Sequence, residues 1–209
     1  MGSQIAITTT LLNVMYYMDT VMLNALKGPQ SAGLYNVALP IMQIVQATMI
    51  FPAVILPIAV EMKKNNEYTK LLKVVRYSLL LAIAAVVPVA VFFHYCSPWI
   101  IQFLFKPEYV TISSTVTILC TGLVFFTLGN LLFQIIICLQ KNICIIIIAT
   151  FSVIVNLLLN YYLILKMDIN GAAYATFISY AIFAISTYIT LEFSLSKQKQ
   201  NENKMETRH

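Results

Sequence analysis

Long apolar segments separated by short polar stretches run through almost the whole chain. Six of them are long enough to cross a bilayer, since a membrane helix needs about 20 mostly apolar residues. They cover residues 5–26, 34–60, 77–95, 115–139, 143–165 and 172–193. The pattern predicts an all-α polytopic membrane protein, a bundle of six transmembrane helices within residues 1–193. Residues 194–209 are rich in Lys, Gln, Asn and Glu and are expected to form a disordered cytoplasmic tail.

Composition supports a lipid environment. Of the 209 residues, 60% are hydrophobic and only 10% are charged, and the mean hydropathy is +0.83. A soluble domain carries about 25% charged residues. The net charge of +5 does not indicate a nucleic-acid partner, because the basic residues gather in loops and in the tail. The four cysteines form no CxxC pair and are expected to pack as small apolar residues.

The basic residues are unevenly divided between alternate loops, and this predicts the orientation. If the N-terminus is cytoplasmic, only Lys27, Lys106 and Lys166 fall on the outer side. The other basic residues fall on the cytoplasmic side: Lys63, Lys64, Lys70, Lys73, Arg76, Lys141, Lys197, Lys199, Lys204 and Arg208. Cytoplasmic loops carry an excess of Lys and Arg. We therefore expect a multi-pass protein of the cell membrane with both termini in the cytoplasm.

The first predicted span carries most of the polar residues. Asn13, Tyr17 and Thr20 recur at helical spacing and share one face. This face either lines a watery cavity or forms hydrogen bonds with neighbouring helices. Asp19 is the only acid well inside a span, where an ionised carboxylate costs about 2.5–3.5 kcal/mol. It is expected to face a cavity or a partner, or else to cap a helix near the outer headgroups.

The second predicted span contains Pro40, Pro52 and Pro57, and each proline removes a backbone donor and kinks a helix. Gln43 and Gln46 lie on one side of this helix near the first of them. A kinked helix with a polar face suits a transporter that alternates between two states, although a static bent helix is the simpler alternative. The segment that follows, 61–76, is either an amphipathic helix on the inner membrane surface or a solvated loop.

Polar residues also occur in the later spans. Asn130 and Gln134 share a face of the fourth span, which adds them to the cavity candidates. In the fifth span Asn156 and Asn160 are four residues apart, and small residues recur at the same spacing in the sixth. For these last two spans we favour helix packing over a substrate site. The sequence has no phosphate-binding loop and no cluster of His, Asp or Glu, so neither an enzyme nor a metal site is expected.

Three regions of the chain, two of them made of two stretches each, together resemble one family. They are YYMDTVML at 16–23 followed by AGLYNVA at 32–38, FKPEY at 105–109, and NLLLN at 156–160 followed by INGAAYAT at 169–176. In this order they are similar to the polysaccharide transporter, or O-antigen flippase, family of the multidrug/oligosaccharidyl-lipid/polysaccharide flippase superfamily. The likeness is to the C-terminal half of its members.

The resemblance implies one half of a twelve-helix bundle, in which two six-helix halves enclose a cavity that opens to one side at a time. Its members move lipid-linked sugars to the outer leaflet. The expected partners are therefore membrane lipid, a lipid-linked sugar, and either a missing N-terminal six-span half or a second subunit. No Lys or Arg lies inside the six spans, so the cations that a diphosphate needs are expected from that partner.

The sequence thus favours part of a flippase that exports lipid-linked oligosaccharide or polysaccharide units across the cytoplasmic membrane. The alternatives are a multidrug or cation antiporter of the same superfamily, a non-transporting scaffold or assembly subunit, and a permease partner of a separate ATPase. No cofactor is expected beyond a coupling ion, H+ or Na+, carried by the acid in the first span. The candidates for the cavity or for coupling are Asp19, Asn13, Tyr17, Thr20, Gln43, Gln46, Asn130 and Gln134.

Overall fold

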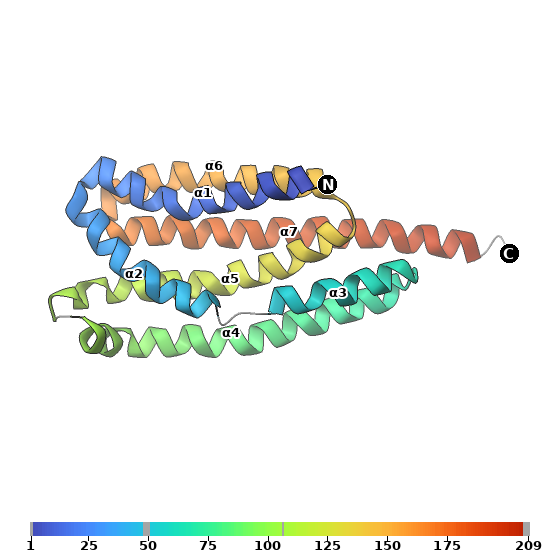
Figure 1. Ribbon diagram of the computed structural model, residues 1–209, viewed down its shortest axis with the longest axis horizontal. Helices are drawn as coiled ribbons and strands as arrows, with labels where there is room; N and C mark the ends of the chain where they lie inside the picture. The colour runs from blue at the N-terminus through green and yellow to red at the C-terminus, as the bar shows by residue number, and fades with distance from the viewer. Residues whose placement is uncertain (1, 48–50, 106, 207–209) are drawn as a thin grey trace.

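The computed structural model describes residues 2–47, 51–105 and 107–206, and the chain forms long helices packed side by side (Figure 1). The helices are α1 (Gly2–Lys27), α2 (Pro29–Ala47), α3 (Phe51–Lys64), α4 (Tyr68–Leu104), the 3-10 helix η1 (Pro107–Ile112), α5 (Ser113–Cys138), α6 (Asn142–Met167) and α7 (Ile169–Glu206). The described residues contain no strand. The predicted all-α class is confirmed.

The turns between helices lie at two ends of the bundle. The α1–α2, α4–α5 and α6–α7 connections are at one end, and the α3–α4 and α5–α6 connections are at the other (Figure 1). The α1–α2 and α6–α7 turns each have one non-helical residue, and in the first it is Gly28, with φ of +93°. Glycine adopts this left-handed conformation without steric cost. Pro29 then begins α2 at once, because a first-turn proline has no need of its missing N–H.

Four of the described helical segments are long and apolar enough to cross a membrane: Tyr68–Leu104, Glu108–Cys138, Ile143–Met167 and Ile169–Ser196. They correspond to the last four of the six predicted spans. These four helical segments support the prediction of a multi-pass membrane protein. Helix α1, with 26 residues, equals α5 and α6 in length. Its polar residues lower its hydropathy, and its role as a span stays a prediction.

The second predicted span, 34–60, differs from the structure. It falls on two helices, because α2 ends at Ala47 and α3 begins at Phe51, while residues 48–50 lie outside the described part. Pro52 is in the first turn of α3, where proline is tolerated. Pro40 and Pro57 lie inside α2 and α3 respectively.

Two further expectations on secondary structure are corrected. The segment 61–76 is neither a separate surface helix nor a loop, since it is shared between the end of α3 and the start of α4. Helix α7 continues to Glu206, so most of the tail expected to be disordered is helical. A helix can outlast its apolar stretch because Lys, Gln and Glu are good helix formers. Lys106 and Arg208 lie outside the described residues.

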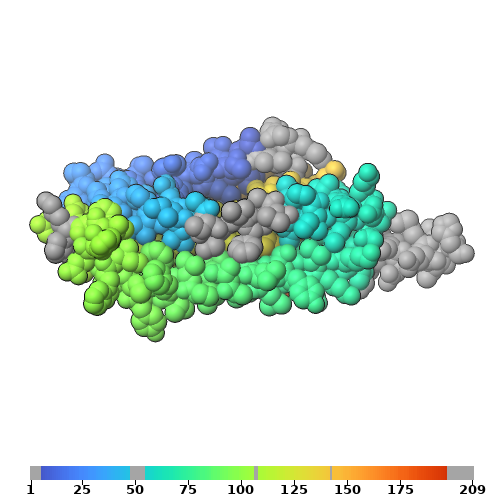
Figure 2. Space-filling model, turned by 60° about the horizontal axis from the view of Figure 1, so that its bottom comes forward, coloured from blue at the N-terminus to red at the C-terminus, as the bar shows by residue number. Residues whose placement is uncertain are grey.

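Helix α5 lies at the centre of the bundle, between α4 and α7 (Figure 1). Two glycines let α7 approach it closely. A Cβ atom added at Gly129 would lie 2.6 Å from Cδ1 of Phe183, and one at Gly122 would lie 3.4 Å from Cα of Phe177. Helices α2 and α3 cover another side of α5, and Figure 2 shows them beside the full length of α4.

Candidate functional site

Asp19, in the second half of α1, is enclosed by three other helices and is 1% exposed. Tyr35 on α2 donates its O–H to Asp19 Oδ2 at 2.7 Å. Asn160 on α6 donates an Nδ2–H to Oδ1, also at 2.7 Å, and the hydroxyl of Thr176 on α7 donates to Oδ2. One carboxylate therefore joins four helices. These four residues are called the Asp19 cluster below.

Around the cluster, two amide atoms are buried and unpaired. Asn160 Nδ2 also donates to Asn156 Oδ1 at 3.0 Å. Asn156 Nδ2 and Asn160 Oδ1 have no hydrogen-bond partner among the described residues. Such atoms cost about 1–3 kcal/mol each when they stay unsatisfied. The oxygens gathered here come from a carboxylate, two amides and two hydroxyls, which is the ligand type of a hard cation.

No basic side chain neutralises Asp19 within the described part of the chain. The salt bridges found there join Lys70 to Glu67 and Arg76 to Glu192, both near the end of the bundle that holds the α3–α4 turn. Nor do these residues contain a group of three His, Cys, Asp or Glu side chains placed to hold a metal ion. Asp19 is thus balanced by neutral hydrogen-bond donors alone.

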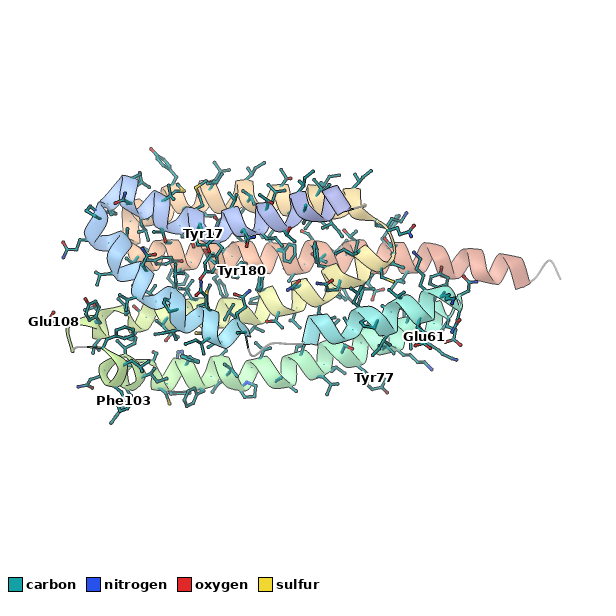
Figure 3. The ribbon with its side chains drawn as sticks, in the orientation of Figure 1. Tyr17, Glu61, Tyr77, Phe103, Glu108 and Tyr180 are labelled. Carbon is teal, nitrogen blue, oxygen red and sulfur yellow. The ribbon has the colours of Figure 1, made fainter. Side chains whose placement is uncertain are left out.

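A separate polar cavity of about 180 Å³ lies between α1, α2, α5 and α7. It is lined by Leu12, Asn13, Tyr16, Tyr17, Gln43, Gln46, Phe126 and Tyr180. Tyr17 on α1 and Tyr180 on α7 lie at a similar level along the bundle (Figure 3). The cavity brings together four of the residues predicted from sequence, two from α1 and two from α2. It is called the amide cavity below.

The remaining candidates lie elsewhere. Thr20 Oγ1 donates to Asn36 Oδ1 at 2.9 Å, which joins α1 to α2. Asn130 and Gln134 are half-buried on α5, but the residue that α5 contributes to the amide cavity is Phe126. Asp19 is turned away from the cavity into the bundle interior. The structure therefore divides the predicted candidates into two sites and leaves Thr20 and the α5 pair outside both.

The lining of the amide cavity suits a neutral, hydroxyl-rich ligand. It contains three amides, and each amide offers both hydrogen-bond donors and an acceptor. Three tyrosines and a phenylalanine add aromatic faces. No Lys, Arg, His, Asp or Glu lines it, so it has no cationic side chain with which to bind a phosphate.

Sequence reasoning missed three members of the Asp19 cluster as functional candidates. Tyr35 and Thr176 went unremarked, and Asn160 was assigned to helix packing. The available signal was the family-like stretches themselves, because Asp19, Tyr35, Asn160 and Thr176 lie in four of them. As favoured from the sequence, Asn156 and Asn160 are fully buried between helices.

Comparison with known proteins identifies the family. A family model described as lipid II flippase MurJ matches residues 5–209. The chain belongs to the MurJ lipid II flippase family. This is a family of membrane transporters and not of enzymes, as the sequence predicted. This match confirms the flippase superfamily that the motifs indicated. The matching model describes its lipid II branch, whereas the motifs had indicated the polysaccharide transporter branch.

A curated relative supports a membrane protein of this kind. The chain is 30% identical over 179 residues to the uncharacterized membrane protein MJ1068 of Methanocaldococcus jannaschii. The alignment covers 82% of this chain but 34% of the relative. The chain thus spans about one third of the length of that relative.

Proposed function

We propose that this chain forms one wall of a membrane flippase that moves a lipid-linked oligosaccharide or polysaccharide unit across the cytoplasmic membrane. The amide cavity carries the proposal, because its uncharged amides and aromatic rings match sugar hydroxyls and sugar-ring faces. Membership of the MurJ family supports a lipid-linked substrate. The alternative of a multidrug or cation antiporter differs in its cargo, and it would use Asp19 to carry the coupled ion.

The face of α1 and α2 that carries the cavity needs an opposing body. Tyr17 is 60% exposed and Ile44 is 69% exposed, and Asn13, Asn36 and Gln43 are exposed on the same two helices. Polar groups facing hydrocarbon are costly. Alternating access also requires a second rigid body against which the first can rock. We propose that this body is another six-span half or a second subunit, with the termini of the chain in the cytoplasm.

The Asp19 cluster is proposed as the coupling site for H+ or Na+. Its oxygens and its lack of a basic partner fit a single small cation or a proton, and its hydrogen bonds reach α1 and α2, the helices that line the amide cavity. Asp19→Asn keeps the shape and removes the charge. In the complete transporter, flipping by this variant should no longer respond to pH or to a Na+ gradient. An unchanged response at equal expression would reduce Asp19 to a structural role.

The test of the substrate site is binding to the chain in nanodiscs. The probe is a fluorescent polyprenyl-diphosphate disaccharide, compared with the same lipid phosphate without sugar. The double change Gln43→Ala and Gln46→Ala should weaken disaccharide binding about tenfold, since it removes hydrogen bonds worth about 1 kcal/mol or more. Asn24→Ala, at an exposed position of α1 outside the cavity, is the matched control. Equal binding of both lipids, or no effect of the double change, would contradict a sugar site.

Transport itself is tested in liposomes with the same fluorescent disaccharide lipid. The 209-residue chain alone should flip no more lipid than empty liposomes do, because its cavity lacks the second wall. Flipping by this chain with no other polypeptide present would refute the requirement for a partner body. Sugar binding without any flipping, even in the presence of a partner body, would favour the scaffold alternative.

A further inference from the structure

A long groove runs along the side of α5 that α2 and α3 leave uncovered. Three hollows, with volumes of about 520, 490 and 260 Å³, are lined only by residues of α4, α5 and α7. The first two share His94 and Thr121, and the second and third share Phe125. The shared residues place the hollows end to end, with α5 as the floor of this groove and α4 and α7 as its walls. It is separate from both the Asp19 cluster and the amide cavity.

One end of the groove is polar and lies beside interfacial aromatic residues. His94 and several hydroxyl groups line this end. The neighbouring Tyr95 and Trp99 on α4 are 72% and 78% exposed. Exposed Trp and Tyr on a membrane helix mark the headgroup level of the bilayer. The polar end of the groove therefore lies where lipid headgroups lie.

Three hydroxyl groups at the polar end donate their protons to acceptors within the protein. Thr117 Oγ1 donates to the carbonyl of Ser113 at 2.9 Å, and Thr121 Oγ1 donates to the carbonyl of Thr117 at 2.8 Å. Ser114 Oγ donates to Asn170 Oδ1 at 3.0 Å. A hydroxyl has one proton and two lone pairs. What these three groups still offer a ligand is acceptor oxygen, which suits a ligand that brings hydrogen-bond donors.

The other end of the groove is apolar and matches one leaflet in depth. It is lined by Leu79, Ile83, Phe125, Leu128, Leu132, Ala184, Ile185 and Tyr188. From Thr121 to Leu132 the floor helix rises about 16 Å at 1.5 Å per residue. Half of a hydrocarbon core of about 30 Å is about 15 Å. An acyl chain lying along this floor would reach the middle of the bilayer.

We propose that this groove holds one membrane phospholipid with a primary ammonium headgroup, of the phosphatidylethanolamine type. The ammonium N–H groups would meet the hydroxyl oxygens of Thr117 and Thr121, and the phosphate would meet the His94 imidazole. An anionic headgroup finds no Lys or Arg in the lining, and a choline headgroup has no N–H to donate. The proposal stands independently of the substrate that the flippase carries.

The experiment is native mass spectrometry of the detergent-purified chain after incubation with equal amounts of phosphatidylethanolamine, phosphatidylcholine and phosphatidylglycerol. The wild-type chain should retain one phosphatidylethanolamine, in about tenfold excess over phosphatidylcholine. Thr121→Trp fills the point where two hollows meet and should abolish this retention. Ile154→Trp introduces the same indole at a half-exposed position on α6 and should leave the retention unchanged.

A second variant separates headgroup recognition from folding. The double change Thr117→Val and Thr121→Val keeps the volume but removes the acceptor oxygens, so a lipid should still bind without preference for phosphatidylethanolamine. A preference that survives this change overturns the headgroup assignment, even if Thr121→Trp fails to fold. Preferential retention of phosphatidylglycerol would also overturn the proposal. So would a dimer that Thr121→Trp dissociates, because it would show that a second copy of the chain occupies the groove.

Discussion

Tyr17 and Asp19 are two residues apart on α1, yet they belong to opposite environments. Tyr17 is 60% exposed at the edge of the amide cavity, whereas Asp19 is 1% exposed among donors from three other helices. Residues two apart on a helix point about 200° apart, since successive residues turn by about 100°. One helix therefore serves a ligand-facing surface and an interior polar joint at once.

The contrast separates two kinds of polar group in a membrane helix. In the Asp19 cluster most polar atoms are bonded to protein, so removing one leaves its partners unsatisfied. In the amide cavity the side chains face open space, so removing one changes what can bind and leaves the packing intact. Stability and ligand binding should consequently respond to different residues of α1 and α2, and four substitutions test this division.

The largest effect on stability is expected from Asp19→Ala. It leaves the donors of Tyr35, Asn160 and Thr176 buried without an acceptor, which should lower the free energy of unfolding by about 2–4 kcal/mol. The measurement is unfolding in mixed detergent and SDS micelles, followed by the fluorescence of Trp99, the one tryptophan of the chain. A loss below about 1 kcal/mol would mean that the cluster contributes little to holding the helices together.

The turn between α6 and α7 positions two members of the cluster, and Gly171 makes that turn possible. A Cβ atom at this position would lie 2.1 Å from the carbonyl oxygen of Leu163. Since the contact is with backbone, Gly171→Ala should cost about 1–3 kcal/mol in the same unfolding assay. Gly33→Ala is the control, because a Cβ there meets nothing within 4 Å. Equal changes in the free energy of unfolding for the two variants would show that the α6–α7 turn accommodates a Cβ atom with little strain.

A smaller effect is expected from Tyr35→Phe, which removes one hydroxyl and keeps the ring. Asp19 loses one of its three donors, so the expected cost is about 1.5 kcal/mol. Tyr17→Phe is the matched change on the cavity side and should cost less than about 0.5 kcal/mol. If the two variants unfold alike, the distinction between the buried cluster and the cavity fails.

The smallest effect on stability is expected from Gln43→Ala, at an exposed position of the amide cavity. It should change the free energy of unfolding by less than about 0.5 kcal/mol and still weaken disaccharide binding. Unfolding and nanodisc binding measured on one preparation check both halves of this expectation. If the loss of stability accounts for the loss of binding, stability and ligand binding do not depend on separate residues, and the division between the Asp19 cluster and the amide cavity fails.

The sequence predicted those parts of the fold that rest on continuous apolar runs. The segments 115–139 and 143–165 correspond closely to α5 and α6, whereas α7 begins near 172 and continues well past 193. The division of 34–60 into α2 and α3 was not predictable in this way, because hydropathy stays high through the prolines that accompany the break. Helix α4 extends beyond 77–95 at both ends because helix formation does not stop where the apolar stretch stops.

The two sites were predictable to different degrees. The amide cavity draws mainly on α1 and α2, neighbours in the chain, and helical spacing could place two of its polar residues on one face of each helix. The Asp19 cluster depends on pairs 141 and 157 residues apart, with Asn160 and Thr176. No periodicity within a single helix reports such a contact. The acid was conspicuous in the sequence, but its partners were visible only as parts of separate motifs.

The single-residue turn at Gly28 has a mechanical consequence. It leaves α1 and α2 almost no freedom to separate, and the hydrogen bond between Thr20 and Asn36 adds a second tie between them. The two helices should therefore tilt as one lever. The sides of the amide cavity formed by Asn13 on α1 and Gln43 on α2 would then travel together. A ligand held between Asn13 and Gln43 would therefore move with α1 and α2, and would not be released, when the two helices tilt together.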